Sequence, residues 1–394
     1  MNRIKNAGLV LLTAFLTGCS GEETMPELTK RVFDIAEKQY IMMDTRLKDD
    51  TMPRSMDSEG NFIDSNLRWW CSGFYPGSLW YIYEYTGNGQ VRALAEKNTE
   101  KLDVLKIKGT DHDLGFQMNC SFGNAYRITG DERYAEPIRT SAEVLAGRFS
   151  PVTGVIKSWD FVNKGRDWKY PVIIDNMMNL EHLYNAGSLF GLDTLKTIAL
   201  THANTTMANH FRPDYTSWHL VDYDPETGAV RSKETVQGFS DSSAWARGQA
   251  WALYGYTMMF RMSGYDCYLS QAENIADMLL KRLPEDGIPY WDFDSDMIPD
   301  DYRDASAAAI MASAFIELST LCNSPKKAAY LETAEKQLRT LASDEYLAQP
   351  GENCNFILRH SVGSLPGNSE VDVPLTYADY YFLEALLRYS RLSE

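Results

Sequence analysis

The chain has 394 residues, of which 44% are hydrophobic and 12% aromatic, and its 54 acidic side chains outnumber its 38 lysines and arginines, giving a formal net charge of −16. This hydrophobic content allows a large core and excludes a wholly disordered chain. The negative charge disfavours nucleic acid and anionic membrane surfaces as main partners, because binding to phosphate-rich surfaces depends on lysine and arginine.

The first residues predict a lipoprotein signal peptide over 1–19. Two basic residues precede an apolar run, Ala7–Leu16, which at about ten residues has half the length needed to span a bilayer. The run ends in LTGC, which resembles a bacterial lipobox with Cys19 as the lipidated first residue of the mature protein. An ordinary signal peptide with an incidental cysteine is the alternative. We expect residues 20–26 to form a polar tether, and a lipid anchor to the bacterial cell envelope, on the periplasmic or outer-membrane face.

Helical periodicity dominates the remaining chain, 27–394, and predicts about twelve helices that come in pairs. Thr-Gly and Ser-Gly steps supply regular stop signals, since glycine suits a left-handed helix cap. The predicted helices are Glu27–Met43, Phe74–Tyr85, Val91–Leu105, Gly115–Ile128, Glu132–Arg148, Asp175–Phe190, Thr194–Asn209, Ser243–Met262, Tyr268–Leu283, Ala305–Leu321, Lys326–Leu341 and Pro374–Arg391.

The paired helices form a weak internal repeat, for which two architectures compete: an open solenoid and a closed toroid. A solenoid repeats at a stricter period than this chain does. Four long connectors rich in Trp, Tyr, Asp, Gly and Pro interrupt the pairs, at 150–170, 211–242, 285–303 and 346–373. We therefore expect one all-α domain, an (α/α)6 barrel of six helical hairpins, with its functional site in these loops.

Several familiar sites are missing from the sequence, including the phosphate-binding loop, the dinucleotide fingerprint, the zinc-protease motif and the nucleophile elbow. The aspartates from Asp292 to Asp300 are spaced like a calcium loop, but Met297 and Arg303 stand where that loop needs Gly and Glu. We expect a surface acidic loop there and no metal site. The five cysteines after Cys19 contain no CxxC pair, which predicts free, buried thiols.

Two aspartates stand where helices are predicted to begin. Asp113, in DHDLGF, and Asp175, in VIIDNMMN, both occupy N-cap positions, where a carboxylate accepts backbone N–H groups. The apolar neighbours of Asp175 indicate a dry setting, which raises a carboxyl pKa toward that of a proton donor at neutral pH. Two such carboxylates on neighbouring helices suit sugar chemistry. Cap and catalytic group both remain open from these residues.

The run WARGQAW, from Trp245 to Trp251, is the other dense cluster. It reads either as a buried aromatic stripe with Arg247 extending outward, or as a sugar-stacking platform beside a donor fork for a carboxylate. His219 gains weight as a site residue because it lies in a long loop near this cluster.

Five segments are shared in order with a known family: RWWCSGFYPGSLW (68–80), HDLGF (112–116), PVIIDNMMN (171–179), QGFSDSSAWARGQAW (237–251) and RDASAAAI (303–310). Together they resemble glycoside hydrolase family 88, the unsaturated glucuronyl hydrolases, which are related to the unsaturated rhamnogalacturonyl hydrolases. The resemblance covers essentially the whole chain after the signal segment.

The resemblance implies an (α/α)6 barrel that removes a 4,5-unsaturated uronic acid from the non-reducing end of lyase-generated oligosaccharides. The implied reaction hydrates the enol-ether double bond. Asp175 matches the family acid that protonates C4 and helps activate water toward C5, and Asp113 matches a second carboxylate that holds substrate and tunes Asp175. The resemblance implies no metal or organic cofactor. Its further site positions are His219, Gln237, and a substrate-contacting wall of Trp70, Trp245, Arg247 and Trp251, with Arg247 and Gln237 as donors to the uronate carboxylate.

The chain departs from the family at two places. Members that prefer sulfated glycosaminoglycan disaccharides carry a basic residue just before the site Gln and a Ser-x-x-Ser-x-Lys segment near the C-terminus. Val236 stands at the first position, while Ser361 and Ser364 keep both serines, as substrate contacts, and Pro366 replaces the Lys. We therefore expect weaker recognition of sulfate.

Three other functions remain as alternatives: an unsaturated rhamnogalacturonyl-type hydrolase acting on pectic fragments, a non-catalytic glycan-binding lipoprotein, and a glycosidase acting on saturated sugars. The pair Asp113 and Asp175 favours an enzyme over a pure binder, which needs aromatic side chains more than buried carboxyl groups.

Overall fold

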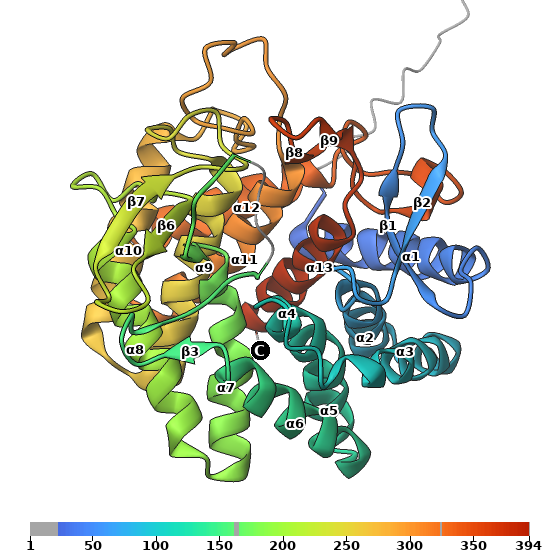
Figure 1. The fold of residues 1–394 in the computed structure, drawn as a ribbon. Helices are drawn as coiled ribbons and strands as arrows, with labels where there is room; N and C mark the ends of the chain where they lie inside the picture. The colour runs from blue at the N-terminus through green and yellow to red at the C-terminus, as the bar shows by residue number, and fades with distance from the viewer. Residues whose placement is uncertain (1–22, 161–164, 324, 394) are drawn as a thin grey trace, which may run out of the picture.

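The computed structural model describes residues 23–160, 165–323 and 325–393. Cys19 and the predicted signal peptide therefore lie outside the described residues. In the described chain, helices alternate strictly between an inner and an outer ring (Figure 1). The outer ring consists of α1 (Met25–Asp44), α3 (Gly89–Lys101), α6 (Ala135–Ala146), α8 (Asp193–Asn209), α10 (Asp266–Arg282) and α12 (Lys327–Leu341).

The inner ring is closed. Each inner helix packs on the next, and the last one, α13, packs against the first, α2. The short helices α4 and α5 are joined by a π-helical turn, Asn119–Gly123, and together fill one place in the ring. The inner helices are α2 (Phe74–Thr86), α4 (Leu114–Met118) with α5 (Asn124–Thr129), α7 (Asn176–Phe190), α9 (Ala246–Ser263), α11 (Ala305–Leu321) and α13 (Thr376–Ser390). The predicted (α/α)6 barrel is confirmed and the open solenoid is wrong.

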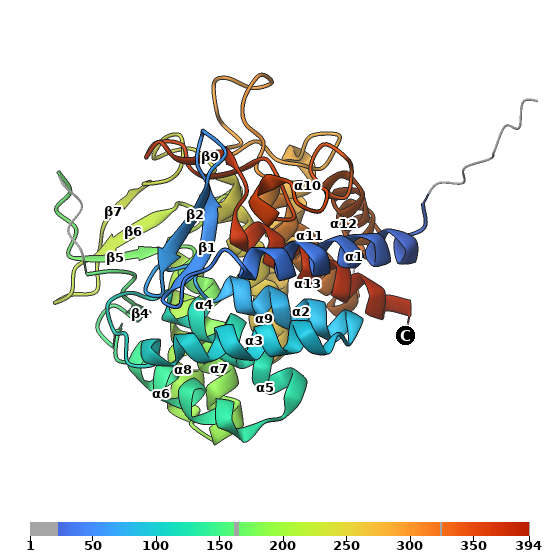
Figure 2. The ribbon, with the colours of Figure 1, turned by 90° about the vertical axis from the view of Figure 1, so that its right-hand side faces the viewer.

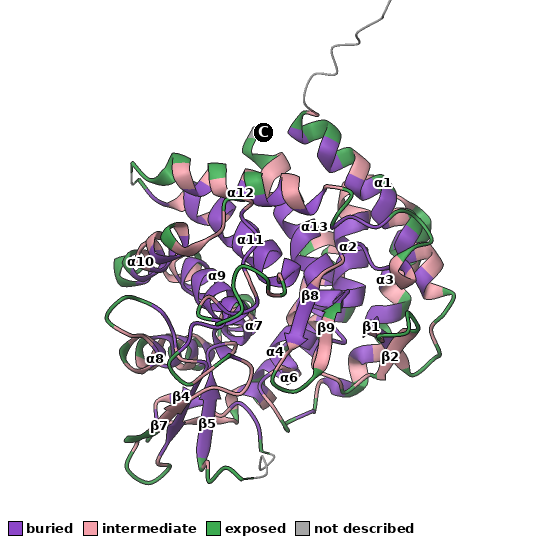
Figure 3. Ribbon diagram, turned by 90° about the horizontal axis from the view of Figure 1, so that it is seen from above, coloured by how far each residue is buried: buried purple, intermediate pink, exposed green. Residues whose placement is uncertain are grey.

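The division into two rings follows from the sequence of each helix. A helix that is apolar all round is buried, whereas an amphipathic one lies at a surface. The inner helix α11 carries a run of alanines and serines, and every residue from Ala305 to Ile316 is buried. Its small side chains allow neighbouring helices to approach on all sides. Figure 3 shows buried residues concentrated in α9, α11 and α13, and exposed ones toward the rim.

Short strands, which the sequence analysis did not predict, occupy the connectors. They form four small antiparallel sheets that lie toward one end of the barrel, while the C-terminus lies at the other end (Figure 2). The sheets are β1 (Thr51–Met56) with β2 (Phe62–Asn66), β3 (Phe149–Ser150) with β4 (Val155–Ile156), β5 (Tyr170–Ile173) with β6 (Leu220–Tyr223) and β7 (Val230–Glu234), and β8 (Ser361–Ser364) with β9 (Ser369–Val373).

The five described cysteines are free, as predicted, but only three of them are buried: Cys267 is exposed and Cys354 is intermediate. In the described ranges, no helix combines the length and the apolar character that a membrane span requires.

Candidate active site

Asp113 and Asp175 lie at the starts of two adjacent inner helices. Asp113 precedes α4 and Asp175 precedes α7, and these helices pack against each other. Neither side chain makes a capping hydrogen bond to its own helix, so the interpretation of either as a simple cap is wrong. Burial, together with the charges of Asp111 and Asp175, holds the pKa of Asp113 well above its usual range. The two carboxyl groups are therefore close enough to influence each other's protonation.

Asp175 has the environment of a proton donor. Its side chain is 14% exposed, and its Oδ2 is buried without a hydrogen-bond partner. Burial raises the pKa of Asp175 to about 6, although the charge of Arg247 and the indole N–H of Trp251 act in the opposite direction. A carboxyl group with a pKa of about 6 keeps its proton in about a tenth of the molecules at pH 7, far more than one with the ordinary aspartate value of 3.8, and this favours general-acid catalysis.

His219 lies beside Asp175 because two of the unpredicted strands pair. Ile173 at the end of β5 is opposite Leu220 at the start of β6, so the residues that flank the strands are neighbours. His219 Nδ1 accepts a hydrogen bond from the backbone N–H of Val236 at 2.9 Å, which leaves the ring proton on Nε2. That nitrogen is 3.8 Å from Asp175 Oδ2. Because burial lowers the pKa of His219 to about 3, the ring is neutral and offers an N–H toward the acid.

Arg247 binds other parts of the protein. It is buried and pairs with the buried Asp304, Nη1 to Oδ2, at 3.1 Å. The same nitrogen donates to the carbonyl oxygen of Val362, and Nη2 donates to that of Gly363 at 2.5 Å. Both terminal nitrogens thus already hold the protein, and donation from Arg247 to a substrate carboxylate stays a prediction that rests on its remaining N–H groups. Arg247 also holds β8 in place and supplies positive charge near Asp175.

Gln237 also helps to hold β8. Its Nε2 donates to the carbonyl oxygen of Gly363 at 3.1 Å, so the expected carboxylate donor is also used to fix β8. Of the two serines on β8, Ser361 is buried with an unpaired Oγ, whereas Ser364 Oγ accepts from the backbone N–H of Gly367 at 3.3 Å. The structure therefore joins Arg247, Gln237 and both serines in one assembly around β8.

The tryptophans form a wall that is mostly buried. Trp245 is 2% exposed and Trp251 is fully buried, so an open stacking platform is wrong for these two. Trp245 packs edge-on against His219, with ring centroids 4.9 Å apart, while Trp251 packs against Phe116 at 5.3 Å. Trp70 is half-buried, and its ring centroid lies 4.9 Å from that of Tyr377. The buried stripe of the first interpretation is correct, but Arg247 lies inside it rather than extending outward.

The acidic loop is a surface loop only in part. Asp292 is fully buried, and its Oδ2 accepts from the backbone N–H of Phe239 at 2.9 Å and from Ser243 Oγ at 2.7 Å. The remaining members, Asp294, Asp296 and Asp300, are exposed. Asp292 therefore fixes the loop that leads from Gln237 to α9. Among the residues with described positions, no group of His, Cys, Asp or Glu is arranged to hold a metal ion.

Two residues of the shared segments were not singled out from the sequence: His112 and Asn179. His112 is fully buried, and its Nε2 lies 3.4 Å from Asp113 Oδ1. Asn179 lies one helical turn after Asp175 and contacts the segment around α4. The adjacency of His112 to Asp113 and the four-residue spacing between Asp175 and Asn179 were the available signals.

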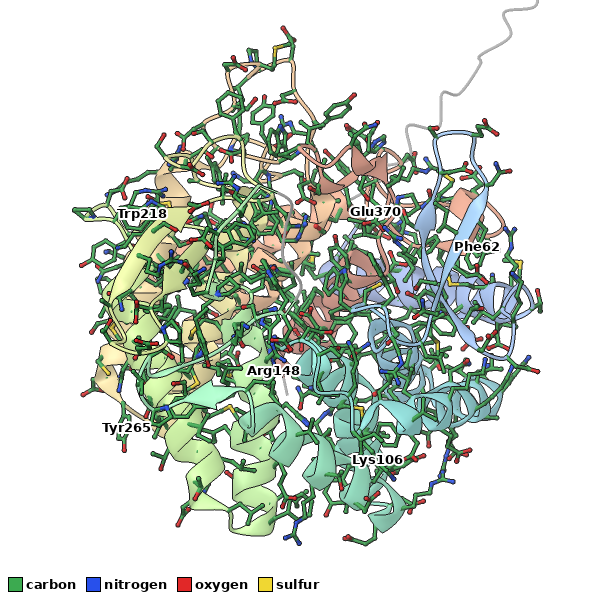
Figure 4. The ribbon with its side chains drawn as sticks, viewed as in Figure 1. Phe62, Lys106, Arg148, Trp218, Tyr265 and Glu370 are labelled. Carbon is green, nitrogen blue, oxygen red and sulfur yellow. The ribbon has the colours of Figure 1, made fainter. Side chains whose placement is uncertain are left out.

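Unpaired polar atoms gather around the two aspartates. A buried polar group without a partner costs free energy, and in a functional site a ligand can supply that partner. In Figure 4, Arg148 lies near the centre of the view, below the labels of Trp218 and Glu370, and its charge acts on Asp113. The unpaired atoms here are His112 Nε2, Asp175 Oδ2, His219 Nε2 and Trp251 Nε1.

Comparisons with known proteins agree with this site. The family model described as Glycosyl Hydrolase Family 88 matches residues 43–385. An unsaturated glucuronyl hydrolase from Formosa agariphila is 42% identical over 100% of this chain and 99% of that protein. An unsaturated chondroitin disaccharide hydrolase from Streptococcus pyogenes is 32% identical over 91% of this chain and 90% of that protein.

A solved structure is also similar. It is described as an unsaturated glucuronyl hydrolase specific for heparin, and it superposes with a TM-score of 0.90 at 46% sequence identity. The alignment covers 93% of this chain and 98% of that chain. Sequence and structure therefore point to the same group of enzymes.

Proposed function

The chain belongs to glycosyl hydrolase family 88, and we propose that it removes a 4,5-unsaturated uronic acid from the non-reducing end of lyase-generated oligosaccharides. The observation that carries the proposal is Asp175: a buried carboxyl group with a pKa of about 6, an unpaired oxygen and a second carboxyl group close by. These are the properties of an acid that delivers a proton to the electron-rich carbon of an enol-ether double bond.

The residues around Asp175 support a reaction in two steps, protonation followed by addition of water. Asp175 donates a proton to C4 of the unsaturated uronate, and the carboxylate that this leaves on Asp175 stabilises the resulting positive charge at C5. Water adds at C5, with Asp175, now ionised, accepting its proton. The hemiketal that forms opens and releases the remaining sugar. Neutral His219 places its Nε2 proton toward Asp175, which orients the carboxyl group between the two steps.

For the substrate, we propose a glycosaminoglycan disaccharide with little or no sulfate on the sugar next to the uronate. Val236 and Pro366 line a cavity of about 490 Å³ close to His219. Arg166 is the one basic residue in its described lining, and it already pairs with Glu234. Asp241 adds a carboxylate to the same wall. A cavity with these charges favours an uncharged sugar over a sulfated one.

We propose further that Cys19 carries a lipid anchor. Figure 2 shows the N-terminal end of α1 on the side of the barrel that holds the C-terminus, opposite the small sheets. A membrane tether preceding α1 would leave the catalytic end facing away from the bilayer. Replacing Cys19→Ala in the full chain should move the protein from the membrane fraction to the soluble fraction; an unchanged distribution would reject the anchor.

The test of function is the ultraviolet absorbance of the conjugated uronate, which disappears when the double bond is hydrated. We expect absorbance to fall with unsaturated disaccharides from hyaluronan, chondroitin or heparin. The fall should be faster for an unsulfated disaccharide than for the sulfated disaccharide of the same backbone. A fall with rhamnogalacturonan lyase products alone would favour the pectic alternative. Binding of the same disaccharides without any fall would favour a non-catalytic glycan-binding protein.

A further inference from the structure

The start of α4 is capped from outside the helix. The side chain of an N-cap residue usually accepts a hydrogen bond from the backbone N–H two or three residues later. Asp113 immediately precedes α4, but its own backbone is already helical (φ −66°, ψ −5°) and its side chain makes no such bond. The backbone N–H of Phe116, three residues on, donates instead to Oδ1 of Asn179 on α7 at 2.7 Å.

We propose that Asn179 is a positioning residue that caps α4 in place of Asp113 and so leaves the Asp113 carboxylate free for the substrate. The role in catalysis rests on the proposed function, whereas the role in capping does not. A carboxylate at an N-cap with no competitor is drawn to the first free N–H groups of the helix. The amide of Asn179 occupies the donor that Asp113 would otherwise bind.

The amide nitrogen of Asn179 supports the same arrangement. Because Oδ1 of Asn179 accepts from Phe116, the orientation of the amide is fixed and its Nδ2 must face the other way. That nitrogen lies 3.4 Å from Nδ1 of His112, which leaves the His112 proton on Nε2. The protonated nitrogen is the one 3.4 Å from Asp113 Oδ1. One side chain therefore both releases Asp113 from capping and orients the histidine beside it.

Gly115 makes the contact possible. A Cβ at this position would lie 2.5 Å from Oδ1 of Asn179 and 2.8 Å from its Cα, a separation that atoms do not adopt. The absence of a side chain at Gly115 lets α4 and α7 approach until the amide reaches Phe116. Asn179 itself is fully buried, one turn after Asp175, so it links the two helices that carry the catalytic carboxyl groups.

The experiment follows the Asp113 carboxyl carbon by NMR in protein labelled at its aspartates, with Asp113→Asn identifying the signal. In Asn179→Ala, Asp113 is expected to bind the free N–H of Phe116, so its titration midpoint moves to lower pH. We expect kcat to fall about tenfold, less than the roughly 10²–10⁴-fold contribution of an acid–base group itself, because Asn179 acts only through Asp113. The variant Asn179→Asp keeps an acceptor for Phe116, and is expected not to lower the midpoint and to regain part of the activity.

Asn185→Ala is the matched control, since this asparagine lies on the exposed face of α7; both readouts should stay as in the wild type. An unchanged Asp113 midpoint in folded Asn179→Ala would overturn the inference. Should that variant fail to fold, a lowered midpoint in Asn179→Asp would overturn it as well. An enzyme inactive on every unsaturated substrate, but with a lowered midpoint in Asn179→Ala, would reject the proposed function and leave the capping role standing.

Discussion

Asp175→Asn is expected to reduce turnover of an unsaturated disaccharide by about 10²–10⁴-fold or more while leaving binding measurable, because the variant keeps the shape of the site and loses its proton donor. Burial gives Asp175 a pKa of about 6, and its Oδ2 makes no hydrogen bond to another described side chain. Absorbance measurements give kcat, and calorimetry gives the affinity. Full activity in this variant would refute the role of Asp175 as the acid.

The same pKa predicts how the wild-type enzyme responds to pH. The donor must carry its proton, so kcat should decline as the pH rises through about 6. Asp175→Glu, which retains a carboxyl group, should keep some activity. Its pH–rate profile should also have a declining limb, in which kcat falls as the pH rises. A wild-type rate that stays constant from pH 5 to pH 8 would contradict the assignment.

Measuring the stability of Asp175→Asn shows whether a loss of activity comes from the missing acid or from unfolding. The folded-state pKa of Asp175 lies above its ordinary value of 3.8, so the folded protein loses stability as the pH rises from about 4 through about 6. The difference corresponds to about 3 kcal/mol at neutral pH. Asp175→Asn removes this ionisation and should be more stable than the wild type at pH 7 by up to that amount, with little difference near pH 4. A less stable variant at pH 7 would indicate a structural role.

The helices could be predicted from the sequence because each one encodes its own pattern. The periodicity over 305–321, for example, gave the bounds of α11 to the residue, and the glycine stop signals at Gly87 and Gly264 do adopt left-handed conformations. The strands could not be predicted, since the two-residue β3 and the four-residue β5 depend on partners far along the chain. Yet the pairing of β5 with β6 is what brings His219 to Asp175.

The chemistry of the site was visible in residue types, but the partners of those residues were not. Arg247 and Gln237 look like donors for a substrate, and the structure adds that both bind the carbonyl oxygen of Gly363. Asp113 looks like a cap until Asn179 is found in that role. A sequence gives the hydrogen-bonding capacity of a side chain, whereas its use is decided by neighbours that only the folded chain brings together.

Arg247→Met is the change expected to have the largest effect on stability. It leaves the buried carboxylate of Asp304 without its ionic partner and the carbonyl groups of Val362 and Gly363 without donors. Breaking a buried ion pair by removing one partner costs about 3–5 kcal/mol. Chemical denaturation of both proteins measures this difference. The matched control is Arg139→Met: Arg139 is exposed and pairs with Glu143 one turn away, and such surface pairs contribute about 0.5 kcal/mol or less.

A second substitution separates the effect of leaving Asp304 unpaired from the effect of releasing β8. Asp304→Asn, added to Arg247→Met, removes the unpaired buried charge and keeps an acceptor for the Ser306 N–H that Asp304 caps, so stability should recover in part. Activity should not recover, because β8 still lacks the donors that hold it. The charge of Arg247 also lowers the pKa of Asp175, so the declining limb of the residual activity should move to higher pH. An Arg247→Met enzyme with wild-type stability and an unmoved limb would show that β8 is held by other contacts.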